Sequence, residues 1–143
     1  MYRSVLLPVD VSEPELTEKS LQQARFLVEK TSASLRLLYV ISTVPDYILN
    51  RFNPQTHQFE DTLATDIKQQ LKAIADKLAQ PEERLSISVR MGSIYDEILK
   101  EAEEVSADLI VIGSRRPSVT TYLLGSNASA IARYAKTSVL VVR

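Results

Sequence analysis

Short apolar runs and stretches of helical spacing alternate along this chain. Val5–Leu7, Leu35–Ile41, Leu109–Ile112 and Val139–Val142 are rich in valine, isoleucine and leucine and too short for ordinary helices, so they predict buried β-strands. Between Leu85 and Met91 apolar and polar residues alternate, which predicts a strand with one exposed face. Five strands are therefore expected.

Helical periodicity appears in the segments between these strands. The clearest pattern begins at Phe59, where apolar residues recur at steps of three and four. In chain order, the predicted helices span Pro14–Lys30, Phe59–Leu78, Ile94 to about Ser106, and Gly125 or Ser126 to Ala135.

Local signals mark where the helices begin. Ser12 and Glu15 have the spacing of a capping box, and Ser93 and Asp96 repeat it. Gly92, just before the second box, is expected only to end its strand. Residues 42–56 follow neither period and predict a long loop.

Strands that alternate with helices predict one doubly wound α/β domain over residues 1–143, with a parallel sheet and helices on both of its faces. The alternating strand, third in the chain, suits a sheet edge. Ligands bind such sheets beyond the carboxyl ends of the strands, where the strand order reverses. Residues that could bind a ligand follow only the first and fourth strands. If both serve one site, these strands are neighbours and the order is 3-2-1-4-5.

The fifth strand then forms the other edge of the sheet. An uncovered apolar edge invites aggregation, and pairing with the same strand of a second copy removes that hazard. We therefore expect a homodimer through the C-terminal strand. The choice between a dimer and a tetramer stays open.

Composition excludes several classes of protein. The 143 residues are 45% apolar and 24% charged, which argues against disorder. No apolar run approaches the roughly 20 residues of a membrane span. The absence of cysteine excludes a disulfide scaffold and a thiolate nucleophile, and it agrees with a cytoplasmic location. The lone histidine, His57, is expected near a helix start rather than in catalysis, and no metal site made of protein ligands is expected.

Charge is distributed unevenly, although the net charge is only −1. The segment from Leu109 to Arg143 holds five basic residues and no acidic one, which leaves a formal charge of −6 on the preceding part. A local cationic field on an acidic body suits a small anion better than nucleic acid. The acidic run of the third predicted helix is interpreted as a solvated face, and its members are Asp96, Glu97, Glu101, Glu103 and Glu104.

A candidate anion site follows the fourth strand. The chain has three glycines, where average usage of about 7% predicts roughly ten. Gly113 allows a ligand to approach the main chain, and Gly125-Ser126 opens a helix whose free N–H groups favour an anion. Arg115 or Arg116 can neutralise phosphate, and Asp10, after the first strand, can accept hydrogen bonds from ribose hydroxyls.

Each of these residues also has a plain structural explanation. A Gly-Ser pair before a helix is commonly only a cap. Asp10 can brace the turn after its strand, and the arginines can be solvated loop charges. The coincidence of glycines, hydroxyls and cations after one strand and at the next helix favours binding.

The sequence resembles the universal stress protein family over essentially its whole length. The run Ser114–Ala128 is most similar to the F/G branch of the single-domain bacterial members. The other supporting segments are Val5–Ser12, Leu38-Tyr39-Val40, Gly92-Ser93, Asp108–Ser114 and Ser138–Val142.

The ATP-binding members of that family carry Gly, two residues, Gly, nine residues and then Gly-Ser or Gly-Thr. Gly113 matches the first glycine and Gly125-Ser126 the last pair, whereas Arg116 replaces the second glycine and the spacing after it is eight residues. The resemblance implies an adenine-nucleotide alpha-hydrolase-like fold and an ATP site, with any Mg²⁺ brought by the phosphates. It places Pro8, Val9, Asp10 and Val40 around adenosine, and Gly113, Ser114, Arg115, Arg116, Gly125, Ser126, Asn127 and Ala128 around ribose and phosphates.

Three functions agree with these observations. The leading hypothesis is a cytoplasmic ATP-binding stress-response regulator. It is favoured over a fast enzyme because no residue of the phosphate site is an evident general base. The second is a slow ATPase or adenylate-transferring enzyme. The third is a dimeric module that binds no nucleotide.

Overall fold

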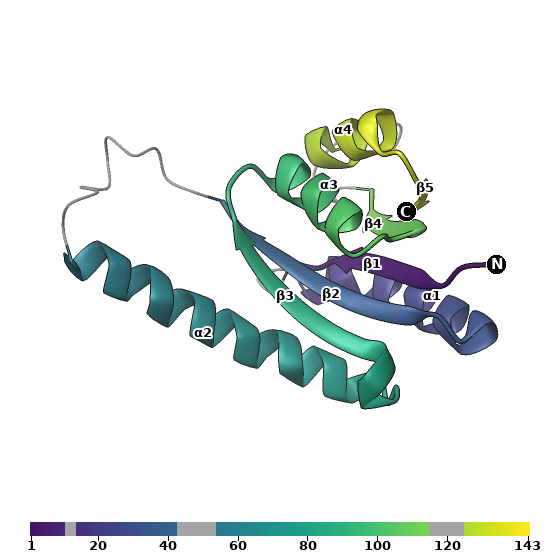
Figure 1. Ribbon diagram of the computed structural model, residues 1–143, viewed down its shortest axis with the longest axis horizontal. Coiled ribbons are helices and arrows are strands. Elements are labelled where there is room, and N and C mark those ends of the chain that lie inside the picture. The colour runs from purple at the N-terminus through teal and green to yellow at the C-terminus, as the bar shows by residue number, and fades with distance from the viewer. Residues whose placement is uncertain (11–13, 43–53, 115–124) are drawn as a thin grey trace.

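Five parallel strands form one twisted sheet in the order β3-β2-β1-β4-β5, which confirms the predicted topology. The computed structural model describes residues 1–10, 14–42, 54–114 and 125–143. Helices cover both faces of the sheet (Figure 1), as a doubly wound α/β fold requires. The strands are β1 Ser4–Pro8, β2 Ser34–Ile41, β3 Leu85–Met91, β4 Leu109–Gly113 and β5 Ser138–Val142.

The helices lie close to their predicted positions. The largest difference is the start of the second helix at Pro54, inside the expected loop, where the fixed φ and missing N–H of proline suit a first turn. The third helix ends before Ser106, which adopts a left-handed conformation (φ 51°) typical of a helix end. The elements are α1 Pro14–Thr31, α2 Pro54–Lys77, α3 Ile94–Glu104 and α4 Ser126–Tyr134, with the short 3₁₀ helix η1 at Glu82–Arg84.

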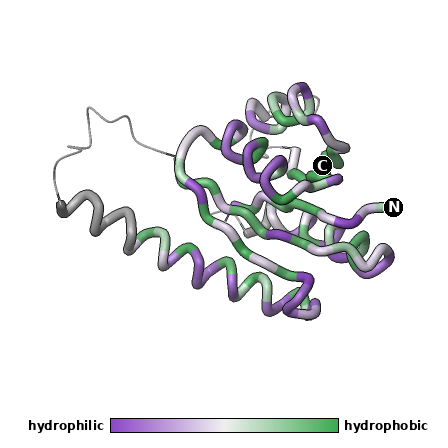
Figure 2. The backbone as a smooth tube through the Cα atoms, in the orientation of Figure 1, coloured by the Kyte–Doolittle hydropathy of each residue, from purple (hydrophilic) through white to green (hydrophobic). Residues whose placement is uncertain are grey.

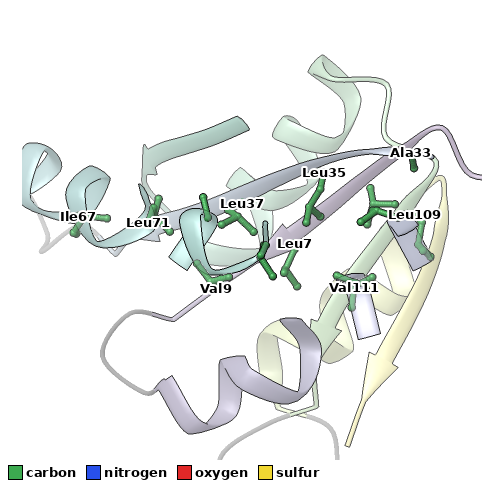
Figure 3. Close-up of a cluster of buried hydrophobic side chains, with 14 of the residues drawn as sticks. Leu7, Val9, Ala33, Leu35, Leu37, Ile67, Leu71, Leu109 and Val111 are labelled. Atoms are coloured by element: carbon green, nitrogen blue, oxygen red, sulfur yellow. The ribbon is translucent and has the colours of Figure 1, made fainter. Parts of the chain in front are cut away.

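Two apolar layers enclose the sheet because alternate strand residues point to opposite faces. Leu7 and Val111 belong to the cluster on the side of α1 and α2 (Figure 3), whereas Leu6 and Ile110 belong to the cluster on the side of α3 and α4. Figure 2 shows the consequence as mostly apolar inner strands and helices that alternate between apolar and polar residues.

An ionic cluster attaches α3 to the edge of the sheet. Glu101 is only 2% exposed, and its two carboxylate oxygens accept hydrogen bonds from Arg36 of β2 (2.8 Å) and Arg90 of β3 (2.7 Å). Arg90 also donates to Glu97 (2.8 Å) and Glu104 (2.9 Å). The interpretation of this acidic run as a solvated face is therefore wrong for Glu97 and Glu101, because the polar edge strand supplies arginine partners.

The charged form of Glu101 is favoured in the folded protein. Burial of the carboxyl group raises its pKa, but hydrogen bonds from Arg36, Arg90 and Ser88 outweigh burial and lower the pKa below its ordinary value. A carboxyl whose folded pKa lies below its unfolded pKa contributes stability above the unfolded value, and this contribution is lost as the pH falls through the folded value.

We predict that Glu101→Gln lowers the free energy of unfolding by about 3 kcal/mol at neutral pH, because it leaves two arginines around a buried neutral group. The difference from the unsubstituted protein should shrink as the pH falls through the lowered pKa of Glu101. Urea unfolding followed by circular dichroism at a series of pH values measures both effects.

Glu103→Gln is the matched control on the same helix. Glu103 pairs with Lys136 at 3.0 Å, but both side chains are largely exposed, so the substitution should change stability by less than about 1 kcal/mol. Equal stabilities of the two variants at neutral pH would contradict the role assigned to Glu101.

Candidate functional site

The carboxyl edge of the sheet brings the sequence-predicted residues into one region. β1 pairs directly with β4, with Val5 opposite Leu109 and Leu6 opposite Ile110. Because the two strands are parallel to each other, the residues at and just beyond their carboxyl ends, Pro8–Asp10 and Gly113–Ser114, lie at the same edge of the sheet. The neighbouring strands assumed from the sequence are confirmed.

One hydrogen bond joins the two ends of the segment between β4 and α4. The Gly125 N–H donates to the Ser114 carbonyl oxygen at 2.8 Å, and the Ser114 N–H donates to the Val142 carbonyl oxygen at 2.8 Å. This bond places the start of α4 beside the end of β4. Arg115 and Arg116 lie outside the described residues.

The three glycines differ in what their backbone requires. Gly92 alone has a positive φ, +145°, and a Cβ there would lie 2.8 Å from Glu97 Oε1. Gly113 is an ordinary strand residue, and Gly125 has φ −59° and ψ 157°, values that any residue adopts. Gly92 is therefore a structural glycine that does more than end its strand, whereas the backbone does not require glycine at 113 or 125.

The N-terminus of α4 faces the same edge. Its N-cap is Gly125, which has no side chain to cap the first N–H groups. Those groups have no partner within the helix, so they are available to an anion. Ser126 is exposed, Asn127 is half-buried and Ala128 is buried.

The prediction that Ser93 and Asp96 form a capping box is wrong, because neither side chain makes the hydrogen bond that the box requires. Ser93 is the N-cap of α3, as expected, but its side chain makes no capping bond. Asp96, which the box would direct back to the N-cap, instead pairs with Lys100 at 3.0 Å. Ser12, the other proposed cap, lies outside the described residues.

The main chain of Asp10 is held by a threonine from α1. Thr17 Oγ1 accepts a hydrogen bond from the Asp10 N–H (3.1 Å) and donates one to the Asp10 carbonyl oxygen (3.0 Å). The preceding Val9 N–H donates to the Leu38 carbonyl oxygen at 2.8 Å. These three bonds position Asp10, which is exposed, beyond the end of β1.

Tyr39 also lies at this edge, although it is not among the site residues predicted from the sequence. Burial of the phenol raises its pKa, and the nearby negative charge of Asp10 raises it further. The side chain packs against the cluster on the side of α1 and α2. The sequence feature that could have identified Tyr39 is its position next to Val40, near the end of a strand that neighbours β1.

Val9, Val40 and Ala128 belong mainly to the core. They are 8%, 7% and 6% exposed, with Val9 in the cluster of Figure 3 and the other two in the cluster beneath α3 and α4. Any ligand at this edge would meet their outer surface and main chain only. The exposed polar groups are those of Asp10, Ser126 and the main chain around Gly113.

Within the described ranges, no three acidic or histidine side chains are grouped so that they could hold a metal ion. None of the helices in the same ranges is long and apolar enough to cross a membrane.

Comparison with known proteins gives one consistent family. A model of the universal stress protein family matches residues 1–143. The chain is 40% identical to universal stress protein G of Shigella flexneri over 143 residues, which cover 100% of both proteins. It is 26% identical to a universal stress protein of Methanothermobacter thermautotrophicus, covering 100% of this chain and 97% of the other.

Solved structures share the fold. Universal stress protein UspA from Lactobacillus plantarum superposes with a TM-score of 0.78 at 23% identity, covering 99% of this chain and 98% of that one. A universal stress protein in complex with cAMP superposes with a TM-score of 0.64 at 24% identity, covering 99% and 97%. At these identities the likeness establishes the fold alone.

We predict that Gly92→Ala lowers the free energy of unfolding by about 2 kcal/mol, because the backbone is strained for any side chain and the new Cβ meets Glu97. Gly125→Ala is the matched control and should lower stability by less than about 1 kcal/mol, since φ −59° suits alanine. Thermal and urea unfolding measure both variants. A larger loss for Gly125→Ala would reverse the assignment of the structural glycine.

Proposed function

Because the chain belongs to the universal stress protein family, we propose that it binds ATP at the carboxyl edge of its sheet and acts as a nucleotide-dependent regulator of the stress response. The observation that carries this proposal is the pair Gly113 and Gly125. Neither backbone requires glycine, yet both lie at the ends of one segment whose base is closed by the Ser114–Gly125 hydrogen bond. A phosphate that rests on main-chain N–H groups needs positions without side chains.

The phosphates would lie against the N-terminus of α4. The N-cap residue Gly125 offers no side chain to the N–H groups that follow it, and the helix dipole favours negative charge there. In this proposal the Ser126 hydroxyl and Asn127 add hydrogen bonds, and Arg115 and Arg116 add positive charge. Any Mg²⁺ would be held mainly by the phosphates.

The nucleoside would lie over the ends of β1 and β2. Asp10 is exposed, and its main chain is held by Thr17. In this proposal its carboxylate accepts hydrogen bonds from the ribose hydroxyls. Adenine would rest on the outer surface of Val40 and the main chain of Val9. The solved relative in complex with cAMP supports an adenine nucleotide as the ligand class.

Regulation is favoured over rapid catalysis by the chemistry of these residues. Among Pro8–Asp10, Gly113–Ser114 and Gly125–Ala128, the only carboxylate is that of Asp10, which the proposal assigns to ribose. Rapid hydrolysis needs a general base within reach of the attacking water. The bound state itself would then be the signal.

We predict that the protein binds Mg-ATP in isothermal titration calorimetry and that Gly125→Val weakens binding at least about tenfold, or 1.4 kcal/mol. Valine is compatible with φ −59°, so the loss would come from its side chain in the ligand's space. Glu103→Gln, on the outer face of α3, is the control and should bind normally. Absence of binding by the unsubstituted protein would reject the proposed function.

A second copy of the chain is the proposed macromolecular partner, through β5. Residues Val139–Val142 are aliphatic and only half-buried, and β5 pairs with β4 on one side alone within the described ranges. Antiparallel or parallel pairing with another β5 would satisfy the main-chain groups of its outer edge.

The hydrogen-bond pattern identifies which residue of β5 to change. The Val142 carbonyl faces β4, because it accepts from Ser114. In a parallel ladder alternate residues face opposite sides, so the Val141 N–H faces the outer edge.

We predict that sedimentation analysis gives a particle of twice the 16.0 kDa chain mass. Val141→Pro should weaken association at least about tenfold, because proline removes an outward N–H and is tolerated at a sheet edge. Val141→Ala removes side-chain atoms but keeps the N–H, so it should weaken association less. A monomer at all concentrations would reject the dimer.

A further inference from the structure

Ser114 connects the candidate nucleotide site to the free edge of the sheet. Its N–H donates to the carbonyl oxygen of Val142, the last residue of β5, and its carbonyl oxygen accepts from the Gly125 N–H, both at 2.8 Å. The Gly125 carbonyl oxygen then accepts the Ser129 N–H at 2.8 Å, which is the first turn of α4. A continuous main-chain path therefore runs from β5 through Ser114 to the start of α4.

This path is the end of the β4–β5 ladder rather than a separate loop contact. Gly113 is paired with Val142, and Ile112 with Val141, in the parallel register. The Ser114 N–H thus extends this ladder by one bond at the carboxyl end of β5. A change in the main chain of Ser114 would alter the end of β5, whose other side is the outer edge.

The same residue lies between the two glycines of the candidate site. A ligand that rests on the main chain at Gly113 and Gly125 restrains Ser114 from both sides. Restraining Ser114 fixes the Val142 carbonyl, and a fixed strand end loses less conformational freedom when it pairs with another strand.

We propose that nucleotide binding at the carboxyl edge and pairing of β5 with β5 of a second copy strengthen each other, with the main chain of Ser114 as the group they share. This inference rests on the proposed function and adds a form of regulation to it. Binding couplings are reciprocal, so nucleotide strengthens dimerisation by the same factor by which dimerisation strengthens nucleotide binding. We expect a factor on the order of ten, within the usual range for coupled sites.

Two variants test the path. Gly125→Pro removes the N–H that bonds to Ser114, and its ring matches φ −59°. The ring also adds atoms near the ligand, so Mg-ATP is used at a concentration that saturates the variant. Glu103→Gln, which changes an exposed side chain of α3 outside the site, is the control.

The experiment measures the dimer dissociation constant by sedimentation velocity, with and without saturating Mg-ATP for each protein. The expected result is a roughly tenfold decrease on adding Mg-ATP for the unsubstituted protein, a similar decrease for Glu103→Gln, and a decrease of less than about twofold for Gly125→Pro. Retained coupling in Gly125→Pro would overturn the path through Ser114.

A second measurement needs no variant and so does not depend on the folding of Gly125→Pro. The Mg-ATP dissociation constant of the unsubstituted protein is measured by equilibrium dialysis at protein concentrations well below and well above the dimer dissociation constant. Reciprocity requires it to be about tenfold lower in the dimer. Normal ATP binding that is equal in monomer and dimer overturns the coupling but leaves the proposed function intact, whereas no ATP binding at either concentration overturns both.

Discussion

The pairing of β1 with β4 is the constraint on which the arrangement of the whole edge depends. Both strands are buried on both faces, with Leu6 and Ile110 on one side of the sheet and Leu7 and Val111 on the other. Only the middle of a sheet covered by helices on both faces offers such burial. The strand order therefore reverses beside β1, and the residues that follow β1 and β4 meet at the position where open α/β sheets bind ligands.

The two outer strands, β3 and β5, carry different kinds of side chains at their exposed edges. β3 carries polar side chains, and Arg90 anchors it to three carboxylates of α3. Charged side chains at an edge strand discourage further pairing. β5 is aliphatic from Val139 to Val142 and half-buried, with no comparable ionic cover among the described residues. The asymmetry favours β5 as the place where the proposed second copy binds, because β5 is aliphatic from Val139 to Val142 whereas β3 alternates apolar with polar residues.

Hydrophobic periodicity predicted the strands, because it follows from which residues must be buried. The strand order came from assuming one ligand site after the first and fourth strands, and three of the four helix starts came from periodicity together with local signals at the helix starts. Periodicity did not predict the surroundings of Glu101. An acidic residue on an amphipathic helix is ordinarily solvated, and its burial here depends on Arg36 and Arg90, which come from two other elements. The contact between Asp10 and Thr17 and the proximity of Tyr39 likewise join residues through tertiary packing. The local sequence pattern does not predict contacts between residues that come from different elements.

The three glycines of this glycine-poor chain have different physical explanations. Gly92 is explained by its own chain, since its φ of +145° and the Glu97 side chain exclude any Cβ. Gly113 and Gly125 have backbone conformations open to every residue, but their surroundings differ. Gly125 is an N-cap, a position where glycine is favoured over alanine, whereas glycine in a strand, as at Gly113, is less stable than alanine by roughly 0.5–1 kcal/mol. Gly113 is therefore the glycine whose presence its own backbone does not explain. The proposed ligand, which would approach the main chain at Gly113, supplies such an explanation.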